Sequence, residues 1–430
     1  MNIHSVLLRE VRVLDVITNT DKIANVVINQ EGIRVIDFLD PNQSLSCDEI
    51  IEAQGLILAP GLVDLYSWVS EPGYEARETL VSLLKASLTG GFTRIAILPR
   101  SKPVIDNLSV LKAVINQVAI FSQEIEPLPE VKFWGALTLN LASQQMTELR
   151  ELSSFVVGFS DGFPIDNLSL LKKIFEYARC LSKPIALVPS LSALRNNGVI
   201  REGVEAMAAG LPVNPEVSES VAIASILEIA DSAKVPVHLM RVSTARGVEL
   251  IANAKKNGLA VTASTSWMHL LFSTEDIITS YDPNLRLEPP LGNQTDKLAL
   301  IAGLEKGVID AIAVDHTPYT YEEKTVAFAE SPPGVIGLQL ILPLLWQHFV
   351  ISGRWTPLQL WKFLCVSPQY CLHQKPLSLF NQNRHECILF DPNKSWVVSR
   401  ENLNSTASNT PWLGKTIKGK VIRVWNNSLE

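Results

Sequence analysis

The residues best suited to chemistry are a few carboxylates and histidines that directly follow apolar, strand-like segments. Asp161 follows such a segment at 155–159, and Asp315 and His316 follow another at 309–314. Carboxylates act as general bases or metal ligands, and neutral imidazoles are common ligands of zinc. The chain has seven histidines, which would suffice for a zinc site. Their positions therefore decide whether the chain could hold one.

A series of βα units must position these residues. Eight short apolar runs alternate with segments of helical periodicity, and eight parallel strands make a (β/α)8 barrel. The runs are Leu56–Leu65, Phe92–Leu98, Val131–Leu137, Phe155–Phe159, Ile185–Val188, Val235–Met240, Leu259–Ala263 and Ile309–Val314. Asn167 and Ser218 are predicted to cap two of the intervening helices. The expected fold class is α/β, with a TIM barrel as the main domain.

Polar, strand-like sequence stands at both ends of the chain. Residues 5–39 alternate as strands do, and the same texture returns after residue 375. We therefore predict one small β-sandwich domain built from residues 1–56 and 378–430, beside a barrel domain of residues 57–377. The longest apolar stretch, Val335–Trp346, is too short to cross a bilayer and is predicted to be a buried helix.

Composition narrows the class of protein. The 430 residues are 47% hydrophobic and carry a net charge of −7, which excludes a disordered chain and, without any basic run, argues against binding to nucleic acid. The N-terminus shows no signal-peptide pattern, and the five cysteines form no C-x-x-C pair. We expect a cytoplasmic protein with free thiols that neither spans nor binds a membrane.

The carboxyl ends of the strands are where the active residues of such a barrel project. In this chain those ends carry Tyr66-Ser67-Trp68, Pro99-Arg100, Thr138, Ser160-Asp161, Val188-Pro189-Ser190, Arg241, Ser264 and Asp315-His316. Very few of these side chains can bind a metal ion.

At these residues the chain resembles the dihydroorotase family of the amidohydrolase superfamily, over nearly its whole length. The motifs that carry the resemblance include Ala59-Pro60-Gly61-Leu62-Val63-Asp64, Glu71-Pro72-Gly73-Tyr74, Arg241-Val242-Ser243-Thr244-Ala245, Glu288-Pro289-Pro290-Leu291, the run from Gly307 to His316, and Asn409-Thr410-Pro411. The resemblance implies an amidohydrolase-type barrel. It also implies an enzyme of pyrimidine synthesis that forms and hydrolyses a cyclic amide with one or two zinc ions.

The ligands that such zinc ions need are replaced here. The family's His-x-His after the first strand corresponds to Tyr66 and Trp68, and the histidines after the fifth and sixth strands correspond to Val188 and Arg241. Indole has no lone pair for a metal, and guanidinium is a permanent cation. The segment of the bridging carboxylate is represented by Ser160-Asp161-Gly162, one aspartate short. We therefore expect no metal and no other cofactor.

The resemblance implies that substrate contacts are lost as well. Residues of other types stand at four substrate-binding positions of the family, namely Ser70, Arg100, Glu288 and Tyr319. Asp315, at the position of the family's general acid/base, remains as a residual catalytic candidate.

The replacements also have structural interpretations. Tyr66 and Trp68 are expected to fill the vacated metal site, with a stacking surface as the alternative. Arg241 is predicted to bind Asp315, and Asp161 where it lies within reach, in place of the metal charge; the alternative is that it extends to solvent. His238 and His269 are expected to be structural, and His316 to be a hydrogen-bonding partner.

Three functions remain from the sequence. The first is a non-catalytic pyrimidine-pathway protein, whose implied partner is aspartate carbamoyltransferase or another enzyme of that pathway. The second is an active dihydroorotase, or related cyclic-amide hydrolase, that uses Asp315. The third is a small-ligand sensor with Arg100, Arg241 and Tyr319 facing an anion. A homo-oligomer is compatible with each.

Overall fold

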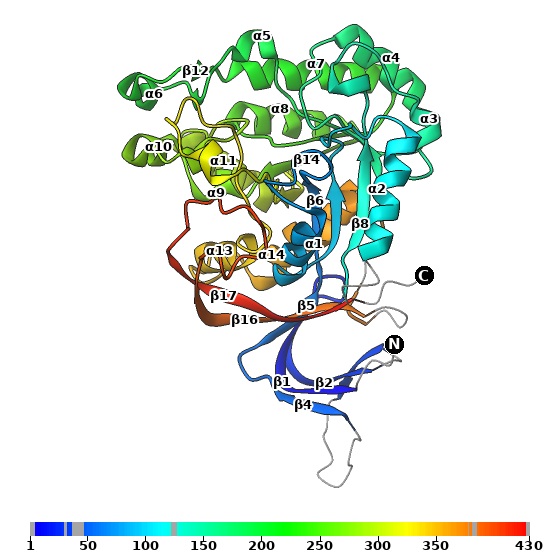
Figure 1. Cartoon of the computed structure of the whole chain (residues 1–430), viewed down its shortest axis with the longest axis vertical. Coiled ribbons are helices and arrows are strands. Elements are labelled where there is room, and N and C mark those ends of the chain that lie inside the picture. The colour runs from blue at the N-terminus through cyan, green and yellow to red at the C-terminus, as the bar shows by residue number, and fades with distance from the viewer. Residues whose placement is uncertain are drawn as a thin grey trace.

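The protein consists of a barrel and a separate sheet that combines strands from both ends of the chain (Figure 1). The structure is a computed structural model that describes residues 5–29, 32–36, 47–121, 127–376, 378–380 and 385–426. Parts of the predicted composite domain, residues 1–4, 30, 31, 37–46, 381–384 and 427–430, lie outside this description.

Eight parallel strands form the barrel, as predicted. In spatial order they are β6 (Leu62–Ser67), β7 (Phe92–Ile97), β8 (Glu130–Gly135), β9 (Gly158–Phe159), β10 (Ile185–Leu187), β13 (Val237–Leu239), β14 (Val261–Ser266) and β15 (Ala311–Ala313). The amide of Trp68 donates to the carbonyl of His316 at 2.8 Å, which joins the two edge strands at the rim. The fourth strand is shorter than predicted, and Phe155 before it is 44% exposed.

Helices connect the strands. The longer ones are α1 (Leu80–Thr89), α2 (Leu108–Phe121), α4 (Leu168–Ala178), α7 (Val217–Ala233), α8 (Ala245–Lys256) and α11 (Gln294–Glu305). Shorter elements are α3 (Leu149–Leu152), α5 (Ser192–Arg195), α6 (Val204–Ala209), α9 (Met268–Leu271), α10 (Thr274–Ser280), α12 (Tyr321–Lys324), α13 (Ile341–Leu345), α14 (Pro357–Trp361), α15 (Ser367–Cys371), β11 (Ile200–Arg201) and β12 (Val213–Asn214).

The two predicted caps have different outcomes. The Asn167 side chain accepts from the amide of Leu170, so the cap of α4 is confirmed. The cap predicted at Ser218 is wrong, because α7 begins at Val217 and the Ser218 hydroxyl donates to Asn214 instead.

The second sheet brings the two ends of the chain together. Its strands are β1 (Val6–Asp15), β2 (Thr20–Asn29), β3 (Gly32–Ile36), β4 (Glu49–Glu52), β5 (Ile57–Pro60), β16 (Glu386–Val397) and β17 (Thr416–Asn426). Strand β16 pairs antiparallel with both β5 and β17. The predicted first barrel strand, 56–65, is therefore two strands, of which only β6 enters the barrel. They meet at Gly61, where a Cβ would lie 2.1 Å from Oγ1 of Thr93, so that the crossing requires glycine.

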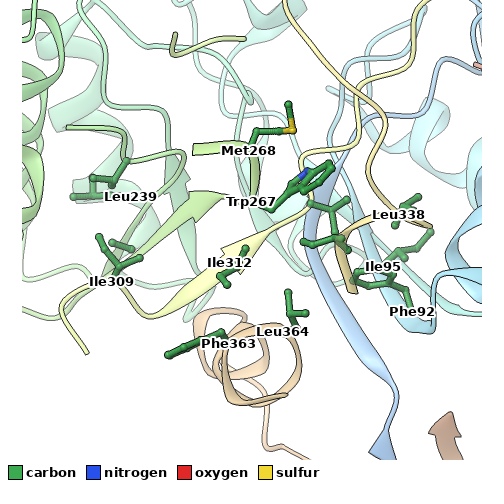
Figure 2. Packing of buried hydrophobic residues seen from close by; sticks show 14 of the residues in the cluster. Phe92, Ile95, Leu239, Trp267, Met268, Ile309, Ile312, Leu338, Phe363 and Leu364 are labelled. Carbon is green, nitrogen blue, oxygen red and sulfur yellow. The ribbon is translucent and has the colours of Figure 1, made fainter. Parts of the chain in front are cut away.

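Period-two alternation along the strands separates two apolar layers. Ala96, Met240 and Ala311 face the interior of the barrel, whereas Ile95 and Leu239 belong to the large cluster outside it. Figure 2 shows this outer layer, where residues of β7, β13 and β15 and of the segment 362–366 pack together. The barrel therefore has a filled interior, and its rim is left for function.

The apolar stretch Val335–Trp346 is buried, but it is helical only from Ile341, where α13 begins. No helix among the described residues is long and apolar enough to cross a membrane. All five cysteines are free, as expected.

Candidate functional site

A cavity of about 480 Å³ opens at the carboxyl ends of the barrel strands. Among the residues predicted for the site, Arg100, Val188, Arg241, Glu288 and Asp315 line it. The others, Tyr66, Trp68, Ser70, Asp161 and Tyr319, are buried around it and do not line it. Charged residues therefore line the cavity at the place where the sequence predicted the functional site.

Arg241 and Asp315 form a bidentate ion pair at the rim, as predicted. Nε and Nη2 of Arg241 lie 2.8 and 2.6 Å from the two carboxylate oxygens of Asp315. The side chains are only 6% and 17% exposed, so the alternative of an arginine extended to solvent is wrong. Burial works to lower the pKa of Arg241, but Asp315 outweighs it and the pKa is raised. The pair thus holds two opposite charges where water has little access.

Asp161 takes no part in this pair, so the predicted second contact of Arg241 is wrong. One oxygen of Asp161 accepts from the amides of Leu137 and Thr138 at 2.6 and 3.0 Å, and the other accepts from the Thr138 hydroxyl at 2.5 Å. Burial nevertheless raises the pKa of Asp161 to about 6. Arg241 uses its remaining Nη1 on the carbonyl of Gly162, at 2.9 Å. It therefore has no nitrogen left without a partner, and the role of an anion-facing group does not suit it.

Tyr66 lies near the carboxyl end of the first barrel strand, β6, and connects the rim to the barrel interior. It is fully buried, as expected for a space-filling side chain. Its hydroxyl lies 2.9 Å from Oγ of Ser264 and accepts from the amide of Arg241 at 3.1 Å. His238 continues this series of hydrogen bonds, with Nε2 2.9 Å from Oγ of Ser264 and Nδ1 2.9 Å from Oγ1 of Thr262. Burial lowers the pKa of His238 to about 3, so the ring is neutral and structural, as predicted.

Trp68 both fills space and stacks. It is 4% exposed, and its Nε1 donates to the carbonyl of Arg100 at 2.8 Å. The guanidinium of Arg100 lies 4.5 Å from the ring centroid of Trp68 and 4.1 Å from that of Phe163. Tyr319 packs edge-on against Trp68, with centroids 5.8 Å apart. Burial lowers the pKa of Arg100 to about 10, which leaves it a cation at neutral pH.

Glu288 lies between two arginines that sequence reasoning missed. Its carboxylate is 3.2 Å from Nη1 of Arg195 and 3.8 Å from Nη1 of Arg286. Arg195 ends the short helix α5, and Arg286 follows a single helical turn at Pro283–Leu285. Neither directly follows a predicted strand, so the strand pattern did not point to them. His269 also lines the cavity, with Nε2 3.3 Å from the carbonyl of Pro290. Burial lowers its pKa to about 4, consistent with the structural role expected for it.

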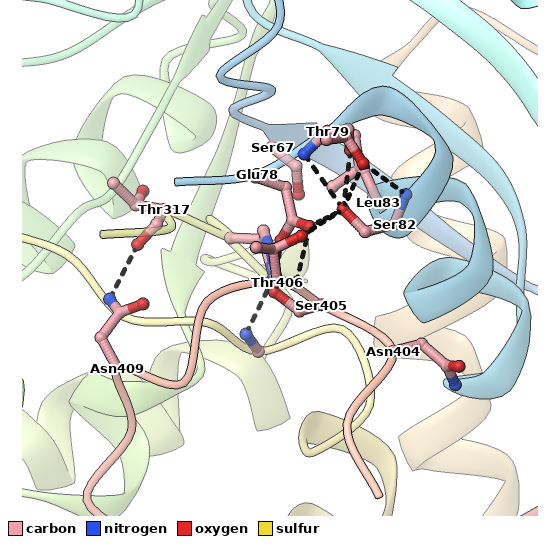
Figure 3. A network of polar contacts seen from close by, with 12 residues as sticks. Ser67, Glu78, Thr79, Ser82, Leu83, Thr317, Asn404, Ser405, Thr406 and Asn409 are labelled. Atoms are coloured by element: carbon pink, nitrogen blue, oxygen red, sulfur yellow. Dashed lines mark hydrogen bonds and ion pairs between the residues drawn. The ribbon is translucent and has the colours of Figure 1, made fainter. Parts of the chain in front are cut away.

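His316 does not line the cavity, and its imidazole contacts Glu78, a member of the polar network that Figure 3 shows. Its Nδ1 accepts from the amide of Gly337 at 3.2 Å, which leaves Nε2 as the donor to Glu78, also at 3.2 Å. Glu78 further accepts from the amide of Thr406 and from the hydroxyls of Ser82 and Ser405. The role of His316 as a hydrogen-bonding partner is confirmed. The network ties the segment around residue 405 to the top of the barrel.

The residues at the rim do not fit zinc. Across the described ranges, no three side chains of His, Cys, Asp or Glu are grouped so as to hold a metal ion. The position nearest Asp315 holds a guanidinium already bound to both carboxylate oxygens. Zinc requires lone pairs from deprotonated or neutral ligands, and Tyr66 with its raised pKa, Trp68, Val188 and Arg241 supply none.

The chain is similar to known proteins over most of its length. The chain is 44% identical over 438 residues to a probable dihydroorotase-like protein of Synechocystis sp., covering 96% of this chain and 98% of the other. It is 36% identical over 376 residues to a dihydroorotase of Pelobacter propionicus, covering 87% of each. No family model matches. Among solved structures, the L-hydantoinase (dihydropyrimidinase) of Arthrobacter aurescens superposes with a TM-score of 0.80 at 20% identity, over 100% of this chain and 98% of the other.

Proposed function

The chain belongs to the dihydroorotase family, and from that premise we propose that it is a non-catalytic member of pyrimidine biosynthesis. The observation that carries the proposal is the contact between Arg241 and Asp315. A general acid/base must offer a lone pair or a proton to the substrate. Both oxygens of Asp315 accept from one guanidinium, which is itself held by the carbonyl of Gly162, so that the carboxylate could take up a proton only by weakening this ion pair.

The poor fit of the rim residues to zinc supports the same proposal. In this family, zinc activates the attacking water and polarises the amide, and each contributes several kcal/mol to transition-state stabilisation. The charge of Arg241 cannot replace this, because guanidinium has no coordination site at which water could lose a proton. Its positive charge compensates Asp315 electrostatically and leaves no route to hydroxide.

A second candidate is an active dihydroorotase, supported by relatives that bear that name at 36% identity and below. It would require Asp315 to leave Arg241 when substrate binds. The cost is high, because the guanidinium is 6% exposed and would remain as a buried, unpaired cation. The structure favours this candidate less for that reason.

The decisive experiment combines metal analysis with turnover. We expect the purified protein, after incubation with zinc and dialysis, to retain only substoichiometric zinc and to show no interconversion of dihydroorotate and carbamoyl aspartate above buffer. Asp315→Asn should behave as the wild type does. Stoichiometric zinc, or turnover that Asp315→Asn abolishes, would establish the second candidate instead.

The proposed role is structural, with aspartate carbamoyltransferase, or another enzyme of the same pathway, as the partner. The family resemblance supports this choice. Co-expression with the carbamoyltransferase of the same organism, followed by size-exclusion chromatography with light scattering, should give a complex of defined mass. If the two proteins elute separately at micromolar concentration, the partner proposal is wrong; elution of this chain alone as a multiple of 47.4 kDa would identify a homo-oligomer.

A further inference from the structure

The cavity at the barrel rim carries an excess of positive charge that its own residues do not compensate. Four arginines line it, Arg100, Arg195, Arg241 and Arg286, against two carboxylates, Glu288 and Asp315. Two positive charges are therefore in excess, in a protein whose net charge is −7. A locally cationic cavity in an acidic protein concentrates anions at that point.

The compensation is uneven around the cavity. Asp315 forms an ion pair with Arg241, whereas Glu288 forms ion pairs with both Arg195 and Arg286. Arg100 forms no ion pair with any described carboxylate and is held instead between the rings of Trp68 and Phe163. Stacking fixes the plane of the guanidinium, whose edge carries the N–H donors. One of these donors interacts with the Tyr319 hydroxyl, and none of them is paired with a described carboxylate.

Buried donors near Glu288 also lack partners. Nε of Arg195 and Nε of Arg286 are buried and donate no hydrogen bond in the described part of the protein. Burial lowers the pKa of Arg286, Glu288 opposes this, and the neighbouring Arg195 adds to it. Uncompensated donors at this depth each cost free energy unless a ligand atom pairs with them.

The size of the cavity limits the ligand. About 480 Å³ lies within the range of sites for small molecules and excludes a macromolecular chain. Planar guanidinium groups bind carboxylate and phosphate groups with paired hydrogen bonds.

We propose that this cavity binds a small organic dianion, carrying carboxylate or phosphate groups, through Arg100 together with Arg286 and Arg195. The site requires neither zinc nor turnover, so it is independent of the proposed non-catalytic role. It also differs from the sensor considered from the sequence, because Arg195 and Arg286 take the place of Arg241.

Isothermal titration of the full chain at constant ionic strength tests the proposal with three probes. Succinate represents dicarboxylates, inorganic phosphate represents phosphate groups, and succinamide is the neutral control. We expect saturable binding of succinate, phosphate or both, and none of succinamide. Arg100→Gln and Arg286→Gln should each weaken binding about tenfold or more, because each removes a charged pair. Arg150→Gln, on the exposed side of α3, is the matched control and should bind as the wild type does.

Circular dichroism of each variant verifies folding, and Arg100→Lys provides a second test. Lysine keeps the charge but loses the planar, stacked donor, so affinity should fall between those of the wild type and Arg100→Gln. Binding of phosphate alone would assign the site to phosphate groups, and binding of succinate alone would assign it to dicarboxylates. The absence of saturable binding by either anion, or equal affinities of Arg100→Gln, Arg286→Gln and Arg150→Gln, would overturn the proposal.

Discussion

Removing the guanidinium of Arg241 should destabilise the protein far more than removing an exposed arginine. In Arg241→Met, Asp315 loses both of its side-chain donors, at 2.8 and 2.6 Å, and the carbonyl of Gly162 loses a third hydrogen bond. Breaking a buried pair on one side costs about 3–5 kcal/mol. The Asp315 side chain is 17% exposed beside a cavity that can admit water, so we expect the lower end, about 3 kcal/mol.

A double-mutant cycle separates the pair from general packing. Asp315→Asn keeps the size of the side chain and removes the charge, and should cost about 2 kcal/mol because Arg241 retains Gly162. In the variant with both changes no unpaired charge is buried, so its loss should be smaller than the sum by about 2 kcal/mol.

Urea denaturation followed by tryptophan fluorescence measures the four free energies of unfolding, with Arg150→Met as the control for an exposed arginine. If Arg241→Met loses no more stability than Arg150→Met, the pair does not stabilise the rim. If the two single changes are additive, Arg241 and Asp315 are not coupled, and the interpretation of Arg241 as compensation for Asp315 is refuted.

Three other predictions follow from the structure. Burial lowers the pKa of His238 in the folded state to about 3, so below about pH 6.5 the unfolded chain binds a proton that the folded chain does not. Relative to His238→Gln, the wild type should therefore lose about 1.4 kcal/mol of unfolding free energy for each pH unit between pH 6.5 and 4. Urea denaturation across that range measures this loss, and parallel pH profiles of the two proteins would contradict the prediction. Glu78→Ala removes the acceptor shared by His316, Ser405 and Thr406. Limited proteolysis should therefore cut near residue 405 faster in this variant than in the wild type or in the control Glu401→Ala. Equal rates would show that Glu78 does not hold the segment around residue 405. The combined variant Tyr66→His, Trp68→His, Val188→His and Arg241→His should retain zinc after dialysis by elemental analysis; a folded, zinc-free variant would show that these are not the ligand positions.

The barrel could be predicted because its signal is local. Each βα unit shows its own periodicity, and eight of them in order define the fold without knowledge of distant contacts. The boundary at Gly61 could not be found in this way. The run 56–65 is apolar throughout, and it divides into β5 and β6 only because β16, more than 320 residues later, pairs with β5. Periodicity carries no information about such a partner.

The sequence predicted the contacts of the site correctly where the type of one residue determines its partner. Arginine beside an uncompensated aspartate implied a bidentate pair, and the structure contains it. Asp161 shows the limit of this reasoning, because two backbone amides, invisible in a sequence pattern, already satisfy its carboxylate. Arg195 and Arg286 were missed for a related reason, since they reach the cavity from the ends of short helical segments too brief to show a periodic pattern.

The stability of the rim and the proposed absence of catalysis have the same physical origin. A carboxylate buried at the mouth of a barrel needs a neighbouring positive charge, which zinc supplies in metal-dependent relatives and Arg241 supplies here. Lysine in this position could make only a point contact, whereas the guanidinium occupies both oxygens at once and reaches Gly162 as well. The backbones of Arg241 and Asp315 are both left-handed, with φ of 53° and 51°, a conformation that costs about 1 kcal/mol or more for each and persists only if the surroundings determine it. The proposed loss of activity follows from the same contact, because Asp315 would have to leave Arg241 before it could serve a substrate. Restoring turnover would therefore require replacing Arg241 and the metal ligands together, because neither change alone both frees the acid and compensates its charge.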